Sequence, residues 1–180
     1  IQSDWLLGEE QIRSYFAQPS RAVQLLSDKK TALKPITLTV ANFGDRYVEY
    51  GQVIKNQISK AGFEVTLEIL SRSQYLTRVW YGKDFEIFVG PVPPASSTNS
   101  FLLPLLHSRG QWHITGHEDM ELDRLIEEQS TEMDMDRRKE LLLEIQARVL
   151  TQGLMFMPVI TVERWAFDSR ITDFHPNLTM

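Results

Sequence analysis

Three short segments of the chain alternate apolar and polar residues, which is the period of a half-buried strand. They cover residues 36–40, 63–69 and 85–89. The intervening residues 46–61 and 71–81 instead place apolar side chains at helical spacing. Strands that alternate with helices in this order pair in parallel through right-handed crossovers. The pattern therefore predicts the α/β class, with an open, mostly parallel sheet flanked by helices.

Further helices and extended pieces surround this unit. Helical spacing recurs over residues 9–17, 20–30, 118–130 and 136–152, and extended patterns occur over 157–162 and 165–167. The chain has 180 residues, which suits one domain or one lobe of a larger protein.

Two loops leave the predicted sheet at the carboxyl ends of strands, over residues 42–45 and 90–99. The second loop holds three prolines and no charged residue, so it is neither a helix nor a central strand. In open parallel sheets, ligands bind in the crevice outside these strand ends. Both loops are therefore candidate binding segments, and ordinary surface loops are the alternative.

Composition narrows the functional classes. Hydrophobic residues make up 42% of the chain, enough for a core, and the formal net charge is −5. Nucleic-acid binding is not expected, because Lys and Arg form no cluster that would displace counterions. The absence of cysteine removes disulfides, thiol nucleophiles and Cys-zinc sites.

No apolar run approaches the roughly 20 residues of a membrane helix. No signal-peptide pattern opens the chain, so an exported protein is expected to contain it as a mature part.

Titratable residues form no strong catalytic or metal-binding motif. His113 and His117 stand four residues apart, a zinc spacing only on a helix, and the glycine between them indicates a loop. No metal site is therefore predicted. The acids of residues 118–136 surround a predicted amphipathic helix, so a solvated face is expected. The alternative is a hydrolase that uses Asp119 and Asp123 as its carboxylates.

A series of segments, in order and with consistent spacing, carries a family resemblance. The segments are residues 18–26, 36–44, 53–65, 75–87, 101–108, 115–126 and 157–159. Together they resemble the second, C-terminal lobe of the extracytoplasmic solute-binding proteins of peptide-type ABC importers (family 5), a lobe of the periplasmic-binding-protein type II kind. The resemblance covers about residues 12–175. Its specificity lies in the ordered series and not in any one motif.

The resemblance implies a binding protein and not an enzyme. Such a protein closes on its solute by hinge motion and delivers it to an ABC permease. The implied partners are a small-molecule or peptide solute, the permease, and a first lobe of the same polypeptide; no cofactor is implied, and a monomer is expected. The implied location is periplasmic or otherwise extracytoplasmic, with a lipid anchor at an upstream N-terminus as one arrangement. A ligand-sensing module of a regulator or receptor on the same fold is the alternative.

The resemblance also divides the chain. Residues 1–34 are expected to be a helical lead-in, residues 35–158 the ligand-binding α/β lobe, and residues 159–180 strands that return toward the hinge and the first lobe.

We expect the ligand cleft to be lined by residues from the two loops, with two outer candidates from a later loop. These residues are Asn42, Phe43, Gly90, Pro91, Val92, Pro93, Trp112 and His113. Gly90 would let the backbone approach the ligand. Trp80 lies on a helical apolar face and is expected in the core instead.

Two positions depart from the pattern of the family's oligopeptide-binding members. Pro91 stands where a tryptophan is typical, and Pro94 stands where an acid pairs with the peptide's amino terminus. Proline provides neither charge nor a backbone donor. Recognition of a peptide amino terminus is therefore not expected, and the pocket is predicted to suit a different solute.

Overall fold

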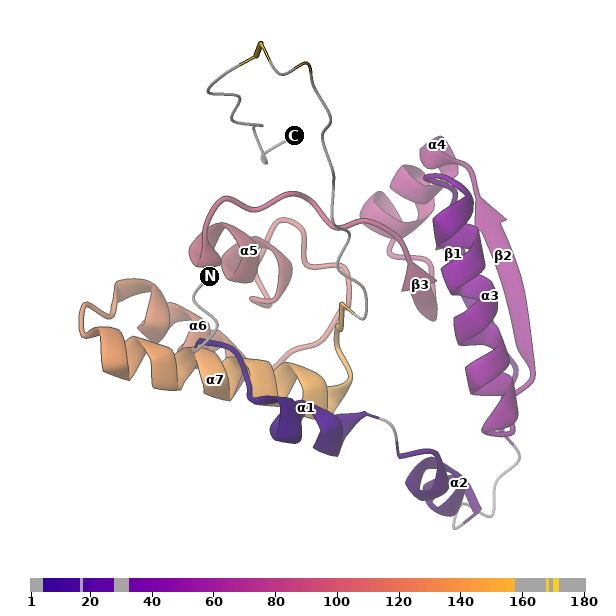
Figure 1. Cartoon of the computed structure of the whole chain (residues 1–180), viewed down its shortest axis with the longest axis horizontal. Coiled ribbons are helices and arrows are strands. Elements are labelled where there is room, and N and C mark those ends of the chain that lie inside the picture. Colours follow the sequence, from indigo (N-terminus) through magenta and orange to yellow (C-terminus); the bar gives the residue numbers. More distant parts are fainter. Residues whose placement is uncertain (1–4, 17, 28–32, 158–167, 169, 172–180) are drawn as a thin grey trace.

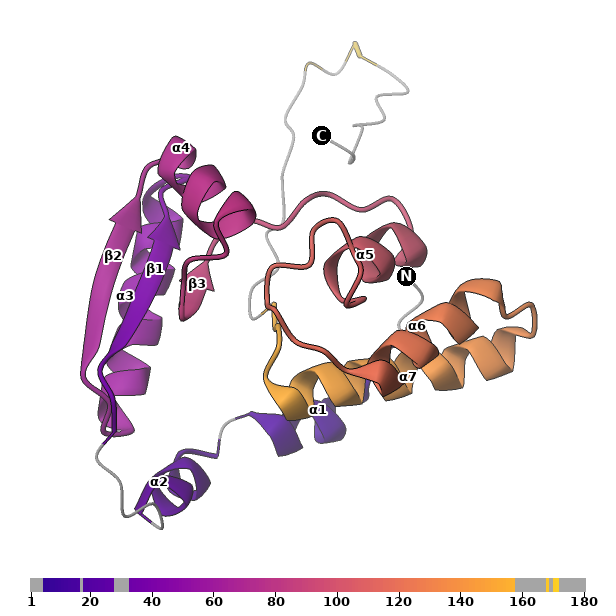
Figure 2. The ribbon, with the colours of Figure 1, turned by 180° about the vertical axis from the view of Figure 1, so that it is seen from behind.

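The computed structural model describes residues 5–16, 18–27, 33–157, 168, 170 and 171. Its elements fall into two neighbouring groups (Figures 1 and 2). One group is a small sheet with helix α3, and the other is a set of helices that contains α1, α5, α6 and α7.

The sheet contains three parallel strands. Strands β1 Ile36–Ala41, β2 Val65–Leu70 and β3 Ile87–Val89 take the spatial order β2-β1-β3. In register, Ile36 lies opposite Val65, and Leu38 lies opposite Ile87. The parallel sheet predicted from the βαβαβ pattern is thereby confirmed, although β3 is two residues shorter at its start than the expected 85–89.

Helix α3, Asp45–Lys60, packs on one face of the sheet. Leu38 and Val40 of β1 are both 0% exposed and pack with Ile54 and other apolar residues of α3. Gly51 makes this contact close: a Cβ at Gly51 would lie 2.4 Å from Cγ2 of Val40. The helix therefore depends on a residue without a side chain where it crosses β1.

The helix expected over residues 71–81 changes its winding. It begins as α4 Arg72–Tyr75, capped by the Ser71 side chain, and continues as the π-helical turn η2 Leu76–Tyr81. The Gly82 N–H donates to the Thr77 carbonyl five residues earlier, at 2.9 Å. Turns of this wider kind are rare and concentrate at functional sites. This one places Trp80 at the site described below.

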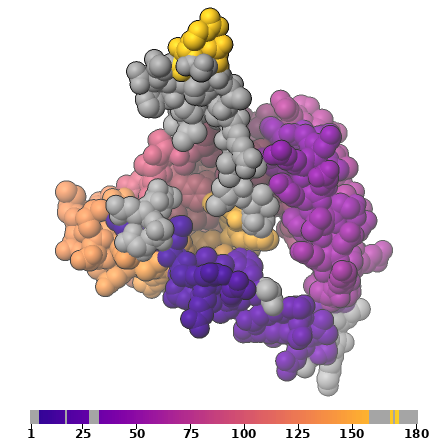
Figure 3. Space-filling view, viewed as in Figure 1, coloured from indigo at the N-terminus to yellow at the C-terminus, as the bar shows by residue number. Residues whose placement is uncertain are grey.

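Five further helices complete the described fold: α1 Glu9–Tyr15, α2 Pro19–Ser27, α5 Thr98–Leu105, α6 Met120–Thr131 and α7 Met135–Gln152. Four of them correspond to the helices expected outside the βαβαβ unit. Gln146 of α7 joins α1 to this group, because its amide accepts from the Leu7 N–H at 3.3 Å and donates to the Trp5 carbonyl at 2.9 Å. In the space-filling view α1 lies against α7, whereas α2 extends away from them (Figure 3). Helix α2 buries none of its residues.

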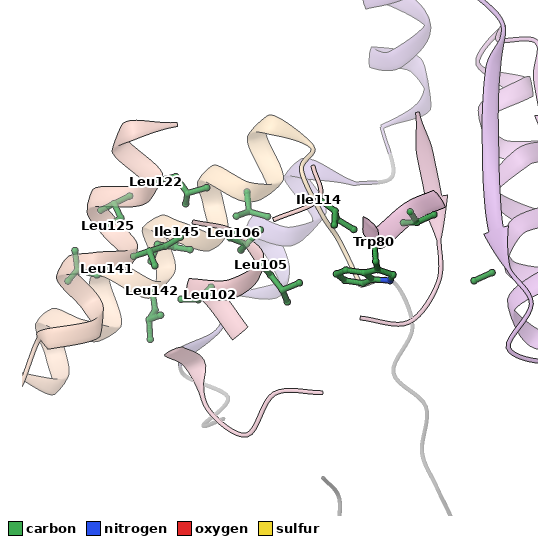
Figure 4. Packing of buried hydrophobic residues seen from close by; sticks show 14 of the residues in the cluster. Trp80, Leu102, Leu105, Leu106, Ile114, Leu122, Leu125, Leu141, Leu142 and Ile145 are labelled. Carbon is green, nitrogen blue, oxygen red and sulfur yellow. The ribbon is translucent and has the colours of Figure 1, made fainter. Parts of the chain in front are cut away.

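One hydrophobic cluster joins the two groups. The labelled side chains run from α6 and α7 through Leu105 and Ile114 to Trp80 (Figure 4). Trp80 is 8% exposed, which confirms its predicted place in the core. The segment that carries Trp80 is therefore packed from both sides, against the sheet and against the helices.

The C-terminal predictions lie largely outside the described residues. The strands expected over 157–162 and 165–167 fall there except for Met157, which belongs to no strand. The division at residues 34 and 158 stays a prediction. Within the described part of the chain, no helix has both the length and the apolar character to cross a bilayer.

Candidate functional site

A pocket lies at the carboxyl edge of the sheet, where the three parallel strands end together. Its volume is about 220 Å³. The lining comes from the segment after each strand and from the loop between α5 and α6: Phe43, Tyr75, Leu76, Trp80, Pro91, Val92, Pro93 and Trp112. Parallel strands bring their carboxyl ends to one edge, so segments far apart in the sequence meet there.

Aromatic rings in edge-to-face contact form much of the pocket wall. The Phe43 and Tyr75 rings lie 5.6 Å apart at 80°, and the Trp80 and Trp112 rings lie 5.7 Å apart at 83°. Tyr75 and Trp80 connect the two pairs at 6.3 Å and 86°. Edge-to-face pairs at such separations are favourable beyond the area that they bury. The four rings therefore form one continuous, mutually supported wall.

Tyr75 fixes the loop that follows β3. Its hydroxyl donates to the Pro91 carbonyl at 2.6 Å, and its ring is only 2% exposed. A Cβ at Gly90 would lie 2.9 Å from three atoms of the Tyr75 side chain. Burial is the main cause that raises the pKa of Tyr75, to about 12. The hydroxyl is therefore protonated at neutral pH and holds Pro91 in place.

Trp112 forms the outer wall and is held by its backbone. Its backbone N–H donates to the Pro104 carbonyl of α5 at 2.9 Å, and the residue is 36% exposed. The segment between α5 and α6 thereby brings the indole to the pocket while leaving part of it in solvent.

No residue that lines the pocket has a charged side chain. A cation lies close to the pocket: the guanidinium carbon of Arg72 lies over the Phe43 ring, 5.0 Å from its centroid. The wall is thus neutral and aromatic, with one cation near its rim.

The fold resembles solved structures of ABC-transporter substrate-binding proteins. The substrate-binding protein CtaP of Listeria monocytogenes matches with a TM-score of 0.66 and 15% identity, over 78% of this chain and 31% of its own. A mannohexaose-bound periplasmic oligopeptide-binding protein of Thermotoga maritima matches with a TM-score of 0.71 and 14% identity, over 84% and 32%. The nonapeptide-bound oligopeptide-binding protein AppA of Bacillus subtilis matches with a TM-score of 0.61 and 18% identity, over 75% and 30%.

This chain shares its fold with part of these substrate-binding proteins. It spans 31% of the length of CtaP, so the likeness concerns one part of such a protein. No protein-family profile and no curated protein matches the sequence. The fold class predicted from the sequence, an α/β lobe of the periplasmic-binding-protein type, is confirmed by these structures.

Of the eight residues predicted for the cleft, five line the pocket at the carboxyl edge of the sheet: Phe43, Pro91, Val92, Pro93 and Trp112. Gly90 lies beside them, but the space beyond its Cα is filled by Tyr75 and not left to a ligand. Asn42 is exposed, and its side-chain oxygen accepts from the Gly44 N–H at 3.3 Å, so it shapes the turn after β1.

His113, the remaining predicted residue, does not line the pocket. It is 5% exposed, directly after Trp112, and its ring lies 4.5 Å from that of His117. Burial is the main cause that lowers the pKa of His113, and the neighbouring His117 lowers it further. His113 is therefore a buried, neutral residue of this loop.

The other two histidines of this loop also have structural contacts. Nδ1 of His107 accepts from the Arg109 N–H at 3.1 Å, so Nε2 carries the proton and donates to Glu127 at 3.0 Å. Nε2 of His117 donates to the Leu106 carbonyl at 2.9 Å. In the described part of the chain, no three His, Cys, Asp or Glu side chains gather as a metal site requires.

Asp119 and Asp123 differ from the solvated face expected for the acids around α6. Their side chains are only 9% and 18% exposed. Asp119 caps α6 and pairs with Arg148 at 2.7 Å, an ion pair that is the main cause of its strongly lowered pKa. Asp123 accepts from the backbone N–H of Ser108 at 2.8 Å and from its hydroxyl. Partners distant in the sequence satisfy both carboxylates, which permits their burial. Neither carboxylate lines the pocket.

Sequence reasoning missed three lining residues, Tyr75, Leu76 and Trp80. They follow β2 at the same edge as the predicted loops, so the rule of strand ends applied to them as well. Their helical apolar spacing concealed this position, because a helix face that packs in a core has the same spacing.

A larger hollow of about 600 Å³ lies between α1, α5 and α7 and is apolar. Ile12, Phe101 and Val149 are among its lining residues. It shares no lining residue with the pocket at the strand ends.

Proposed function

We propose that this chain is the solute-binding lobe of an extracytoplasmic binding protein that serves an ABC importer. The lobe captures a small solute, peptide-like or other, in a cleft shared with a first lobe, and the protein delivers the solute to a permease. The observation that carries the proposal is the neutral aromatic pocket at the carboxyl edge of the parallel sheet. The solved structures with this fold are named as transport proteins, which supports a binding role and not an enzymatic one.

The size of the pocket supports a shared cleft. Pockets that enclose a whole small ligand occupy about 300–1,000 Å³, whereas this one measures about 220 Å³. The lobe therefore supplies one wall, and closure against a second lobe completes the site. Binding then favours the closed form through contacts that exist only there. A ligand-sensing module would use the same pocket and stays a prediction from the sequence.

Isothermal titration calorimetry with a panel of solutes tests the proposal. The panel includes di- and tripeptides, oligosaccharides and aromatic compounds, and each is titrated into the full-length protein and into this chain alone. We expect a solute that binds the full-length protein tightly and the lone chain much more weakly. Equal, tight affinity in both would contradict the shared cleft, and turnover of any solute would contradict the role as a binding protein.

Trp112→Ala in the full-length protein tests the position of the site. Loss of one half-exposed indole from the wall is expected to lower affinity about tenfold or more, the usual effect of truncating an aromatic anchor. Tyr81→Ala is the matched control, since Tyr81 is 77% exposed, follows Trp80 directly and does not line the pocket. Unchanged affinity in the Trp112 variant would place the site elsewhere.

A further inference from the structure

The volume of the pocket fits a single ring. A cavity of about 150 Å³ lined by aliphatic and aromatic side chains is large enough for benzene. The pocket at the strand ends measures about 220 Å³. It therefore has room for one six-membered ring with a short substituent, and the rest of a solute would extend into the cleft.

Two polar groups of the lining residues are already paired with each other. The Tyr75 hydroxyl and the Pro91 carbonyl bond to each other at 2.6 Å. Pro91 and Pro93 have no backbone N–H, so the loop offers fewer donors to an anion than another sequence would. A cation that entered would lose its hydration without gaining an opposite charge from the lining residues. An anion would meet only the Arg72 guanidinium at the rim, which already lies over the Phe43 ring.

Aromatic walls also attract cations, so a cationic group is the competing occupant. Two observations disfavour it here. The Arg72 guanidinium carbon already lies over the Phe43 ring, 5.0 Å from its centroid, so a cation occupies that ring face. Its positive charge would repel a second cation there. In addition, no acid is among the residues that line the pocket.

We propose that this pocket is a subsite for one uncharged apolar ring of the solute. The inference rests on the proposed function and specifies the class of group that the site accepts. The ring packs against the edge-to-face wall of Tyr75, Trp80 and Trp112 at the separations that aromatic pairs prefer. Trp112 is 36% exposed, so its free surface is the part of the wall that a ring would cover.

Four probes, one neutral, one anionic and two cationic, test the subsite in the 180-residue chain. Benzyl alcohol, phenylacetate and benzylammonium share one ring and differ in charge, and tetramethylammonium tests an aromatic cation cage. Each is titrated at pH 7 while the indole N–H resonance of Trp112 is followed by nuclear magnetic resonance. Trp112→Phe assigns that resonance. We expect benzyl alcohol to shift it with at least tenfold higher affinity than the three charged probes.

Two variants locate the effect. Trp112→Ala is expected to weaken benzyl alcohol binding about tenfold, measured by saturation transfer to the ligand. Tyr81→Ala, an exposed aromatic outside the pocket, is expected to leave it unchanged. Equal or tighter binding of a charged probe at Trp112 overturns the neutral subsite and leaves the proposed solute-binding role standing. Absence of binding by all four probes also overturns it. The calorimetric panel on the full-length protein judges the solute-binding role separately, so the two failures are distinguishable.

Discussion

Replacing Tyr75 with phenylalanine tests how the pocket loop is held. The substitution removes the hydroxyl that donates to the Pro91 carbonyl at 2.6 Å and leaves the ring, which is 2% exposed, in place. A hydrogen bond of this kind contributes about 1–1.5 kcal/mol to stability. At pH 7 we therefore expect Tyr75→Phe to lower the free energy of unfolding by about that amount.

The pKa of Tyr75 makes this difference depend on pH. Burial raises the pKa from 10.0 in the unfolded chain to about 12 in the folded protein. A raised pKa stabilises the fold fully below pH 10, and this stabilisation is lost as the pH rises from 10 toward 12. At pH 11 the loss amounts to about 1.4 kcal/mol, because the folded state then holds a proton that the unfolded state has largely released. Phenylalanine does not titrate, so the gap between the two proteins should nearly close at pH 11.

Urea unfolding at pH 7, 9 and 11, followed by circular dichroism, measures this gap. The control is Tyr81→Phe, because Tyr81 is 77% exposed and its removal should change stability by less than about 0.5 kcal/mol at every pH. Hydrogen exchange of the Val92 amide reports whether the loop itself loosens. A constant gap between wild type and Tyr75→Phe from pH 7 to 11 would refute the buried, proton-bearing hydroxyl.

Three further predictions concern the frame around the pocket. Gly51→Ala places a Cβ 2.4 Å from Cγ2 of Val40 and should cost about 1–3 kcal/mol through overpacking. Asp119→Ala removes the cap of α6 and leaves Arg148 without its partner, at an expected cost of about 2–3 kcal/mol. Because Arg148 lowers the pKa of Asp119 from 3.8, this contribution is present above pH 4 and is lost as the pH falls below it. Burial lowers the pKa of His113 from 6.5, so wild-type stability should fall as the pH drops below about 6.5, and His113→Gln should flatten that fall.

Each of these predictions is checked by urea unfolding against a control variant or a contradicting outcome. Gln52→Ala, at the exposed neighbour of Gly51, should leave stability nearly unchanged. If Gly51→Ala proved equally harmless, α3 would not lie as close to β1 as described. Asp119→Asn should retain part of the cap but lose the ion pair, so a cost equal to that of alanine would contradict a separate capping contribution. An unchanged pH profile in His113→Gln would show that another group governs stability between pH 5 and 7.

The elements and their parallel arrangement were largely predictable from the sequence. Apolar spacing of two or of about 3.6 residues is a local property, so the strands at 36–41 and 65–70 and the helix at 45–60 appear in it directly. The position of the site was predictable as well, because the carboxyl ends of parallel strands share one edge whatever the side chains are. This is why Phe43 and the segment Pro91–Pro93 are predictable as lining residues from the sequence.

The composition of the pocket was decided by tertiary packing. Trp80 has the spacing of a core residue and is one, yet it also forms part of the wall, and no local pattern separates these roles. The space at Gly90 was expected to admit a ligand, whereas Tyr75, 15 positions earlier in the sequence, fills it. Asp119 was expected in solvent and is buried because Arg148, 29 residues away, neutralises it. The sequence by itself determined the period of each element and hence the sheet edge where a solute would bind. Which atoms face that edge, and with what charge, followed only from contacts between residues distant in the chain, since burial and pairing are properties of the folded neighbourhood.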